Sequence, residues 1–346
     1  MTAKSLKYSD AGVNVDVWNK AKGRIGELVA STYNNHVLGK FGQFGGMFDI
    51  TSLTGISHPI LVSSTDSVGT KVMIAFESGV HNTIGEDIVN HCINDILVLG
   101  AKPLFFLDYI GIHKLLPEVA ESIITGLTKA CKTSGCVLIG GETAEMPALY
   151  KPGEFDLVGC IVGVVDKPKI IDGSTIVPGD ILIGLKSNGL HTNGYSLARK
   201  IVTEVAGKKY SDVFDATKRT FGQELLRPHR CYLPVWNLMQ KNLIKGCAHI
   251  TGGGFQDNVD RILPENCNAF VDTKTWTPDS IFSFMQKAGN VEAEEMYHTF
   301  NMGVGLVMAV KQSDVDTVMK SPELNGFDPV IIGKVTSGSG KVNLEF

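Results

Sequence analysis

Four short segments that combine glycine with acidic or hydroxyl side chains interrupt the apolar runs of this chain, and they constrain its fold more than any other feature. They are residues 64–71, 94–103, 140–147 and 251–254. Glycine lets bare backbone N–H groups approach phosphate oxygens, and carboxylates hold a hard cation such as Mg²⁺. The pattern therefore indicates a phosphate and magnesium site, and an enzyme that uses ATP is the first hypothesis.

The length of the chain predicts more than one domain. At 346 residues it exceeds the size to which a single hydrophobic core usually grows. Lys167 and Pro168 precede a polar, turn-rich segment at 172–174, which is typical of a domain boundary. We therefore expect an N-terminal domain over residues 1–168 and a C-terminal domain over 169–346.

Charge and cysteine usage exclude several classes of protein. The net charge of −4 and the lack of a basic block argue against a nucleic-acid partner. No long apolar run predicts a membrane span, and residues 1–5 lead into a polar segment rather than a signal peptide. The seven cysteines form no C-x-x-C pair, which favours buried thiols in a reducing compartment over zinc or disulfides. We expect a cytoplasmic protein.

The apolar periodicity alternates strands with helices. Thr83 and Glu86 have the spacing of a capping box, Gly100 stands where the helix that follows them should stop, and Pro117 begins a second helix. Glycine-rich loops are expected directly after Ser63 and Ile139. The predicted strands are 59–63, 104–110, 137–139, 156–165 and 181–185, and the predicted helices are 86–99, 117–135 and 195–205.

The candidate metal ligands are three acids in similar settings. The chain has neither a P-loop nor a dinucleotide-binding fingerprint, so a nucleotide must be held in another way. Asp66, Asp95 and Glu142 each close a strand or helix beside glycine or threonine. Any one of them alone is more often a turn or cap carboxylate, but their joint occurrence favours a metal site for phosphoryl transfer.

Other polar residues allow two interpretations each. His191 lies in a glycine-flanked loop and is either catalytic or a surface histidine, and Lys71 is either a phosphate ligand or, the favoured choice, an exposed lysine. Asp87, His91 and Asp95 follow one another at steps of four, which suits a metal face but more often marks a solvated polar face.

Two glycine-rich loops are equally open to interpretation. Residues 39–46 could close over a ligand or form a surface turn whose phenylalanines pack inward, and residues 251–254 could hold phosphate or only make a tight turn.

Two motifs resemble a known family. Residues 95–103 read D-x-x-x-x-G-A-x-P and residues 140–147 read GGETAEMP, which together are similar to phosphoribosylformylglycinamidine cyclo-ligases, also called aminoimidazole ribonucleotide synthetases. The likeness covers nearly the whole chain. Its further matching segments are 8–15, 65–71, 103–109, 189–200, 248–254, 288–301 and 303–305.

The resemblance implies an activity, a fold and an assembly. The activity is the ATP-dependent closure of formylglycinamidine ribonucleotide to aminoimidazole ribonucleotide in purine synthesis, in which the formamide oxygen is phosphorylated and then displaced by the amidine nitrogen. The fold would be α/β of the α+β type, with two domains and the active site in the cleft between them. The N-terminal domains of two subunits would share a β-barrel in a homodimer.

The resemblance also implies roles for single residues. Asp66, Asp95 and Glu142 would hold Mg²⁺ on the ATP phosphates. Three further groups of residues would complete the site: Gly140, Gly141, Glu142 and Thr143 at the nucleotide, His191, Asp66, Asp95 and Lys71 in catalysis, and Asn193, Thr251, Gly252, Gly253 and Gly254 at the substrate and its 5′-phosphate.

The chain departs from the family pattern at a few positions. Ser64 and Ser67 stand where the family usually has glycine, Met302 replaces a common cysteine, and a family methionine is replaced near His91. Rival activities on the same fold are selenophosphate synthesis and thiamine phosphate phosphorylation. A rival of another class is a nucleotide sensor, which would bind ATP without hydrolysis that depends on substrate.

Overall fold

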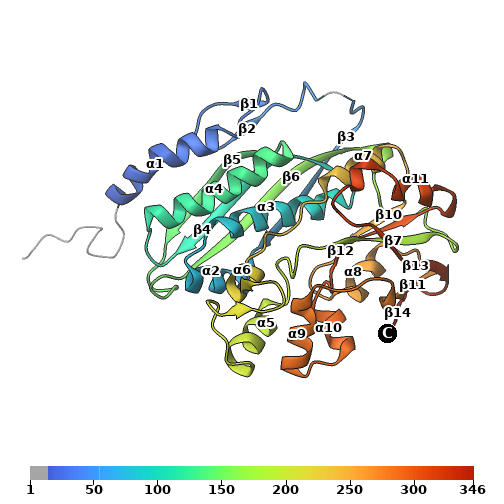
Figure 1. Cartoon of the computed structure of the whole chain (residues 1–346). Helices are drawn as coiled ribbons and strands as arrows, with labels where there is room; N and C mark the ends of the chain where they lie inside the picture. The colour runs from blue at the N-terminus through green and yellow to red at the C-terminus, as the bar shows by residue number, and fades with distance from the viewer. Residues whose placement is uncertain (1–14, 54) are drawn as a thin grey trace, which may run out of the picture.

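The computed structural model describes residues 15–53 and 55–346, and its main elements are two β-sheets (Figure 1). The N-terminal sheet has four strands in the order β3-β6-β4-β5. Only β4 and β5 run parallel, and the other two pairs are antiparallel. The strands are β3 (Pro59–Ser67), β4 (Lys102–Ile112), β5 (Val137–Glu145) and β6 (Phe155–Asp166).

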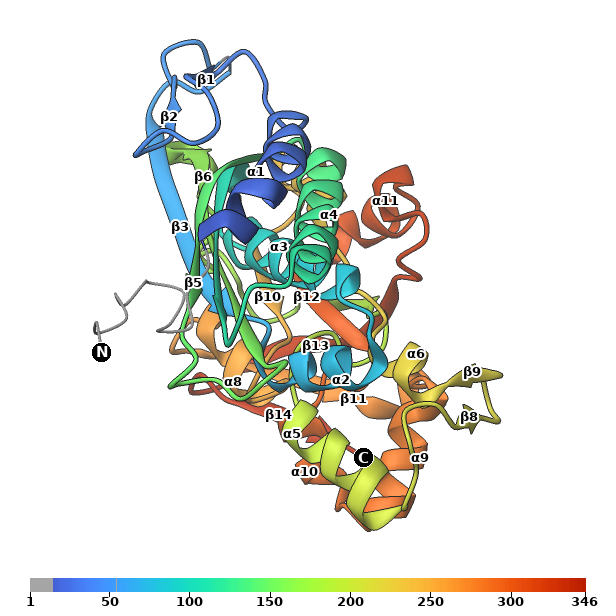
Figure 2. The ribbon, with the colours of Figure 1, turned by 90° about the vertical axis from the view of Figure 1, so that its left-hand side faces the viewer.

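Three long helices cover one face of this sheet, as Figure 2 shows from the side. They are α1 (Val15–Ala30), α3 (Asn82–Leu97) and α4 (Pro117–Ser134). Along β6 buried and half-buried residues alternate, because successive side chains of a strand point to opposite faces and only one face meets the helices. Gly85 and Gly126 let α3 and α4 pack backbone to backbone, since a Cβ at either position would clash with the other helix.

The C-terminal half is built on a six-stranded sheet in the order β10-β12-β7-β13-β11-β14. Its interior strand β12, between β10 and β7, is buried along its whole length, which explains its uninterrupted apolar sequence. The strands are β7 (Ile181–Lys186), β10 (Gly246–His249), β11 (Cys267–Asp272), β12 (Val304–Val310), β13 (Val330–Ser337) and β14 (Val342–Glu345).

Short helices and two small two-stranded sheets complete the described part of the chain. The helices are α2 (Val72–Ser78), α5 (Tyr195–Lys200), α6 (Phe221–Leu225), α7 (Trp236–Gln240), α8 (Gln256–Val259), α9 (Ser280–Gly289), α10 (Ala293–Thr299) and α11 (Val315–Met319). The small sheets pair β1 (Val37–Leu38) with β2 (Met47–Phe48) and β8 (Val213–Phe214) with β9 (Arg219–Thr220). None of the helices within residues 15–53 and 55–346 is both long and apolar enough to cross a membrane.

Most predicted elements are confirmed, and their ends follow the expected chemistry. The helix predicted from Pro117 is α4, and Gly135 ends it in the left-handed conformation with φ 66°. Gly100 likewise follows α3 with φ 84°. The helix predicted from Tyr195 is α5, which continues as a π-helix over Ile201–Val205. The capping box is wrong, because α3 already begins at Asn82 and Glu86 instead accepts a hydrogen bond from Lys129.

Two predicted loops are strands. Asp66 lies inside β3, paired with Gly159 of β6, and residues 140–143 lie inside β5, paired with β4. Glycine and acidic residues disfavour strands locally, but pairing with a neighbouring strand supplies ladder hydrogen bonds that outweigh this preference. In the glycine-rich loop 39–46, Phe41 packs against the core whereas Phe44 is fully exposed. The inward-packing surface turn is therefore confirmed for Phe41 and wrong for Phe44, and closure over a ligand stays a prediction.

The two halves meet along α3. The side-chain amides of Asn90 and Asn94 donate to the backbone carbonyls of His229 and Arg230, each at 2.8 Å. The backbone N–H of Tyr232 in turn donates to Asn94 Oδ1 at 2.9 Å. The polar face of α3 is therefore buried against the C-terminal half, and it is not the solvated face that the spacing of its charged residues favoured.

Candidate functional site

A cluster of acids and imidazoles lies where the last turns of α3 meet β3. Asp66 projects from β3 toward α3, and its Oδ2 lies 2.8 Å from His91 Nε2. The same nitrogen lies 3.5 Å from Oδ2 of Asp95, which is one turn further along the helix. Ser64, on the same face of β3 as Asp66, donates its hydroxyl to Asp95 Oδ2 at 2.9 Å. Strand and helix together thus hold two predicted metal ligands around one histidine.

The C-terminal half supplies the second side of the cluster through His249, the last residue of β10. Its Nδ1 lies 2.9 Å from Asp95 Oδ1. The carboxylates line a cavity of about 390 Å³ that also includes Thr251 and Arg261. Because the side chains of Asp66 and Asp95 remain 43% and 25% exposed, they are open to a ligand. The predicted interdomain site therefore has a physical counterpart.

Five hydrogen-bonding contacts in series connect the two carboxylates. After Asp66–His91, they run from His91 Nδ1 to Thr192 Oγ1 at 2.7 Å and from Thr192 Oγ1 to His229 Nδ1 at 3.2 Å. His229 Nε2 then lies 2.9 Å from His249 Nε2, which leads to Asp95. Each contact needs one proton. If all three histidines are neutral, each carries one N–H, and Thr192 adds one O–H, so only four protons are available for five contacts. With both carboxylates ionised, a full set of hydrogen bonds requires one imidazole to be a cation.

The electrostatics place that charge on His91. Burial opposes it, but the hydrogen bond that His91 donates to Asp66 and the charges of Asp95 and Asp66 raise the pKa of His91 above its ordinary value. Burial lowers the pKa of His249 despite its contact with Asp95, and burial beside other cationic groups lowers the pKa of His229 much further. Both carboxyl groups have a pKa below the ordinary value, because contacts with His91 and His249 outweigh their partial burial.

His191 lies behind this cluster and is buried, so the surface interpretation is wrong. Its ring stacks on His229 with the centroids 4.0 Å apart, and it adopts a left-handed backbone conformation with φ 62°. The backbone N–H of Asn188 donates to Nε2 at 3.0 Å, whereas Nδ1 is buried without a hydrogen-bond partner in the described structure. Burial, together with the charges of His249 and Lys71, lowers the pKa of His191 far below its ordinary value. The ring is therefore neutral, with its proton on Nδ1.

Lys71 is not the exposed lysine that its sequence context favoured. Its Nζ is fully buried and lies 2.8 Å from Asp87 Oδ2. It also donates to the backbone carbonyls of His191 at 2.9 Å and Arg227 at 2.8 Å. Asp87 Oδ1 accepts from the N–H of His229. Lys71 thus ties the loops that carry His191 and His229 to α3, without facing the carboxylate cavity.

The glycine turn after β10 reaches the cavity through its first residue. Thr251 lines the cavity, and Gly253 and Gly254 adopt φ values of 86° and 61° that favour glycine. The side-chain amide of Asn258 donates to the carbonyls of residues 251, 252 and 254, which fixes the turn. A Cβ added to Gly252 would lie 3.4 Å from Asn193 Oδ1. The structure therefore brings together the residues predicted at the substrate.

The residues predicted at the nucleotide lie elsewhere. Asp66, Gly159, Asp108 and Gly141 form one row across the four strands, so Gly141 lies about 14 Å from Asp66, given about 4.8 Å between strands. Glu142 is the next residue, and its side chain projects to the opposite face from that of Asp66. One ion therefore cannot bind Glu142 together with Asp66 and Asp95 of the same chain, and that predicted ligand set needs correction.

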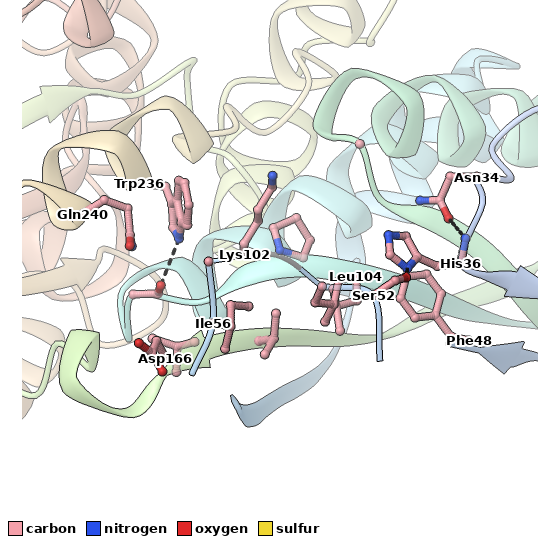
Figure 3. A pocket seen from close by; sticks show the side chains of 17 residues that line it. Asn34, His36, Phe48, Ser52, Ile56, Lys102, Leu104, Asp166, Trp236 and Gln240 are labelled. Atoms are coloured by element: carbon pink, nitrogen blue, oxygen red, sulfur yellow. Dashed lines mark hydrogen bonds between the residues drawn. The ribbon is translucent and has the colours of Figure 1, made fainter. Parts of the chain in front are cut away.

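A separate cavity of about 350 Å³ lies just beyond the C-terminal end of α3, and Figure 3 shows its lining. Trp236 donates its indole N–H to Gly100 O at 3.0 Å, and the ammonium of Lys102 lies 5.4 Å from the indole ring centroid. His36 stacks on Phe48 at the other side of the cavity. None of the predicted site residues lines it, so we do not place the chemistry there.

Sequence reasoning missed three members of the cluster, namely Thr192, His229 and His249. His249 had a usable signal, because it is the last residue of a strand before the glycine turn. Thr192 likewise adjoins His191. His229 lies in an irregular segment between α6 and the turn before α7, and no local pattern marks it.

Comparisons with known proteins match both halves of the chain. Residues 55–165 match the family described as AIR synthase related protein, N-terminal domain, and residues 177–344 match the corresponding C-terminal domain. A phosphoribosylformylglycinamidine cyclo-ligase of Bacillus cereus (strain G9842) is 46% identical over 334 residues, which is 96% of each chain. The enzyme of that name from Trichlorobacter lovleyi is 46% identical over 340 residues, covering 98% of this chain and 97% of the relative.

Solved structures with the same fold are much more distant in sequence. Thiamine-monophosphate kinase from Stenotrophomonas maltophilia K279a has a TM-score of 0.66 at 16% identity, covering 93% of this chain and 95% of that one. The hydrogenase maturation protein HypE in complex with ATP has a TM-score of 0.65 at 17% identity, covering 93% and 90%. These likenesses concern the fold alone.

Proposed function

The chain belongs to the AIR synthase related family, and we propose that it performs the reaction of the phosphoribosylformylglycinamidine cyclo-ligases that it matches over nearly its full length. This reaction of purine biosynthesis converts formylglycinamidine ribonucleotide and ATP into aminoimidazole ribonucleotide, ADP and phosphate. The enzyme is a ligase that forms a C–N bond. All seven cysteines are free thiols, which supports the reducing cytoplasm as its location.

The reaction needs activation of a poor leaving group and then ring closure. The formamide oxygen attacks the γ-phosphorus of ATP, and the bond from that phosphorus to the bridging oxygen of ADP breaks. The amidine nitrogen of the same molecule then bonds to the activated carbon, the carbon–oxygen bond breaks, and phosphate leaves with the former formyl oxygen. A proton is lost from the nitrogen. Because the nucleophile is tethered, the protein mainly positions the substrate and excludes water.

The single observation that carries the proposal is the carboxylate pair in the interdomain cavity. Asp66 and Asp95 approach one another from β3 and α3, are partly exposed, and have a pKa low enough to stay ionised. Carboxylates of this kind fit a divalent cation that bridges them to phosphate oxygens. Such a cation, when bound, would neutralise charge on the phosphoryl group being transferred. We therefore retain Asp66 and Asp95 as its ligands and omit Glu142.

His191 supplies a hydrogen-bond donor rather than a base. A neutral imidazole whose Nε2 accepts from Asn188 carries its proton on Nδ1, and this N–H has no partner in the described structure. The formamide oxygen, or the phosphoryl oxygens that replace it, would satisfy that donor. Because His191 is buried, contact requires the loop between β7 and α5 to shift when substrate enters. Lys71 acts as a positioning residue, because it holds the carbonyl of His191.

We assign the binding of the nucleotide to β5. Within residues 15–53 and 55–346 this strand is the edge of its sheet, so no further strand of that part uses its outer backbone groups. Gly140 and Gly141 expose that backbone, and Thr143 offers a hydroxyl beside it. Glu142 is exposed and already bonds the N–H of Thr143. ATP would then reach from β5 toward the carboxylate pair.

The sheet face without helices supports the shared barrel of a homodimer. Successive rows across β3, β6 and β4 place apolar side chains on that face, among them Val158, Val162, Leu107 and Tyr109. Leu61 on β3 is 57% exposed. A second copy of this face would bury these side chains. Val162→Asp should therefore yield monomers in light scattering, whereas a substitution of similar charge at Ser313, on the far C-terminal surface, should not.

The decisive experiment measures phosphate release from ATP and Mg²⁺ with and without formylglycinamidine ribonucleotide, together with a colorimetric assay for aminoimidazole ribonucleotide. We expect phosphate and aminoimidazole ribonucleotide to appear in equal amounts, and only when formylglycinamidine ribonucleotide is present. ATP binding by folded protein without imidazole formation would overturn the proposal, and it would favour the nucleotide sensor or another substrate.

A further inference from the structure

Nitrogen as well as oxygen donor atoms surround the carboxylate pair of Asp66 and Asp95. His91 Nε2 faces Asp66 Oδ2 at 2.8 Å and Asp95 Oδ2 at 3.5 Å, and His249 Nδ1 faces Asp95 Oδ1 at 2.9 Å. Donor atoms of His91, Asp95 and His249 all lie within 4.8 Å of one another. In a coordination shell with bonds of about 2.1 Å, neighbouring donors lie about 3–3.5 Å apart. The two imidazoles and Asp95 thus lie near the spacing of such a shell, and Asp66 adjoins it through His91.

We propose that His91 and His249 bind the cation together with Asp66 and Asp95, and that the site therefore prefers a first-row transition metal such as Mn²⁺ or Zn²⁺ to Mg²⁺. The inference rests on the proposed function only in that it concerns the same two carboxylates. Mg²⁺ favours an all-oxygen shell that includes several waters, whereas imidazole suits the transition metals. Two carboxylates and two neutral imidazoles also balance the charge of one divalent ion.

The outer nitrogens of both imidazoles already have the partners that a metal-bound histidine needs. His91 Nδ1 lies 2.7 Å from Thr192 Oγ1, which can accept a hydrogen bond from it, and His249 Nε2 lies 2.9 Å from His229 Nε2. Such outer partners fix the ring orientation of metal-bound histidines and raise their basicity. The ion takes the place of the extra proton that the hydrogen-bond series holds between Asp66 and Asp95, so binding releases one proton.

A second group of imidazoles fits a metal less well. His191, His229 and His249 also have nitrogens within 4.8 Å of one another. His191 Nε2, however, already accepts from the backbone N–H of Asn188. A neutral ring then carries its proton on Nδ1, so neither nitrogen has a free lone pair for an ion. The structure therefore favours the mixed site at Asp66 and Asp95.

The test measures metal binding to chelator-treated full-length protein without ATP or substrate. Calorimetric titration should show Mn²⁺ binding at least about tenfold more tightly than Mg²⁺. Pulsed electron paramagnetic resonance of the Mn²⁺ complex should show ¹⁴N coupling from directly bound imidazole. Equal affinity for the two ions, or a Mn²⁺ spectrum without ¹⁴N coupling, would overturn the proposal. Neither result depends on turnover, so a failed cyclisation assay remains distinguishable from a failed metal assignment.

Variants locate the nitrogen donors. His91→Met should weaken Mn²⁺ binding by about 10–100-fold and remove one ¹⁴N coupling, while Mg²⁺ affinity changes by less than about threefold. Thr192→Val should weaken Mn²⁺ binding by a smaller factor, because it removes only the outer partner. His58→Met is the matched control, because His58 is exposed and lies outside the cluster. If His91→Met fails to fold, His91→Gln and the spectrum of the unmodified protein still decide the question.

Discussion

Two clusters on α3, each centred on an aspartate, contain similar residues but have different surroundings and serve different functions. Asp87 pairs with Lys71, and both side chains are fully buried. Asp95, two turns further along the same helix, contacts His91, His249 and Ser64 but stays 25% exposed at a cavity. The comparison teaches that spacing on a helix does not separate a structural acid from a ligand-binding one. The difference arises from the C-terminal half, which buries Asp87 completely but leaves Asp95 beside a cavity.

The buried cluster should dominate stability, and Lys71→Met tests this with the largest expected effect. The substitution leaves Asp87 buried beside no cation, and removal of one partner of a buried pair costs about 3–5 kcal/mol. Burial already raises the pKa of Asp87 to about 6 in the presence of Lys71. The free energy of unfolding, from denaturant titration, should fall by about that amount.

The control for this substitution is a lysine on α4 that pairs with a residue of α3. Lys129 pairs with Glu86 at 2.9 Å but is 65% exposed. Lys129→Met should therefore cost only about 0–1 kcal/mol. Equal losses for the two lysine variants would contradict the distinction between a sealed cluster and an open one.

The open cluster should dominate catalysis, and Asp95→Asn is the corresponding change. Loss of its charge removes one of two carboxylates that face the phosphoryl group, for which a rate loss of about 10²–10³ is expected. The rate is measured as formation of aminoimidazole ribonucleotide under saturating substrate, and denaturant titration gives the stability. Since Asp95 is partly solvated, the midpoint of unfolding should move far less than in Lys71→Met. An active Asp95→Asn enzyme would refute the assignment of Asp95.

Acid should weaken the interface that both clusters share, through His191 and His229. Burial lowers the pKa of both groups below the ordinary value of 6.5, and the nearby charges of Lys71 and His91 lower it further. Their neutral forms stabilise the fold fully above pH 6.5, and this contribution is lost as pH falls toward their folded-state pKa. Each group can then cost up to about 1.4 kcal/mol per pH unit.

The measurement is the free energy of unfolding between pH 7 and pH 5. The pKa of His91 is raised, so its own contribution is full below 6.5 and is lost only as pH rises through its folded-state value. Asp66 and Asp95, whose pKa is lowered, titrate below this window. His229→Gln should therefore show a flatter decline than the unmodified protein. An unchanged slope would show that His229 is not the group that charges on unfolding.

Local sequence patterns predicted the elements of the fold but not what covers them. The end of α4 at Gly135 and the strand character of β4 follow from residues within a few positions of one another. That Gly140 and Gly141 lie in a strand follows instead from pairing with β4, whose sequence begins about 35 residues earlier. The loop predicted around Asp66 failed for the same reason, because it depended on long-range pairing, whereas the capping box at Thr83 failed although its signal was local.

The candidate site shows the same difference between features with a local sequence signal and features that depend on distant contacts. The acids Asp66 and Asp95 were predictable because glycine and threonine beside them mark them in the sequence. Burial of His191 and Lys71 was not, because it depends on the segment around Arg227 folding back over α3. His229 had no signal at all, since nothing near it in the sequence indicates that its ring meets His249. A contact between distant segments is a property of the tertiary structure alone.

The smallest predicted effect concerns the hydroxyl that orients Asp95. Ser64 donates to Asp95 Oδ2 at 2.9 Å, at a position where a glycine could not. A hydrogen bond to a charged, partly solvated group contributes about 1 kcal/mol, so Ser64→Gly should weaken apparent metal and ATP binding by about three- to tenfold while the maximal rate changes little. The KM for ATP at limiting and saturating metal measures both quantities.

The neighbouring residue provides a control that separates the hydroxyl from the backbone. Ser63 is exposed on the opposite face of β3, so Ser63→Gly adds the same strand flexibility without touching Asp95. Both glycine variants should lose about 0.5–1 kcal/mol of stability from backbone entropy, and only Ser64→Gly should alter the KM. A matching rise in KM for Ser63→Gly would attribute the effect to the strand. In that case the open cluster would depend on the rigidity of β3 rather than on a particular hydrogen bond.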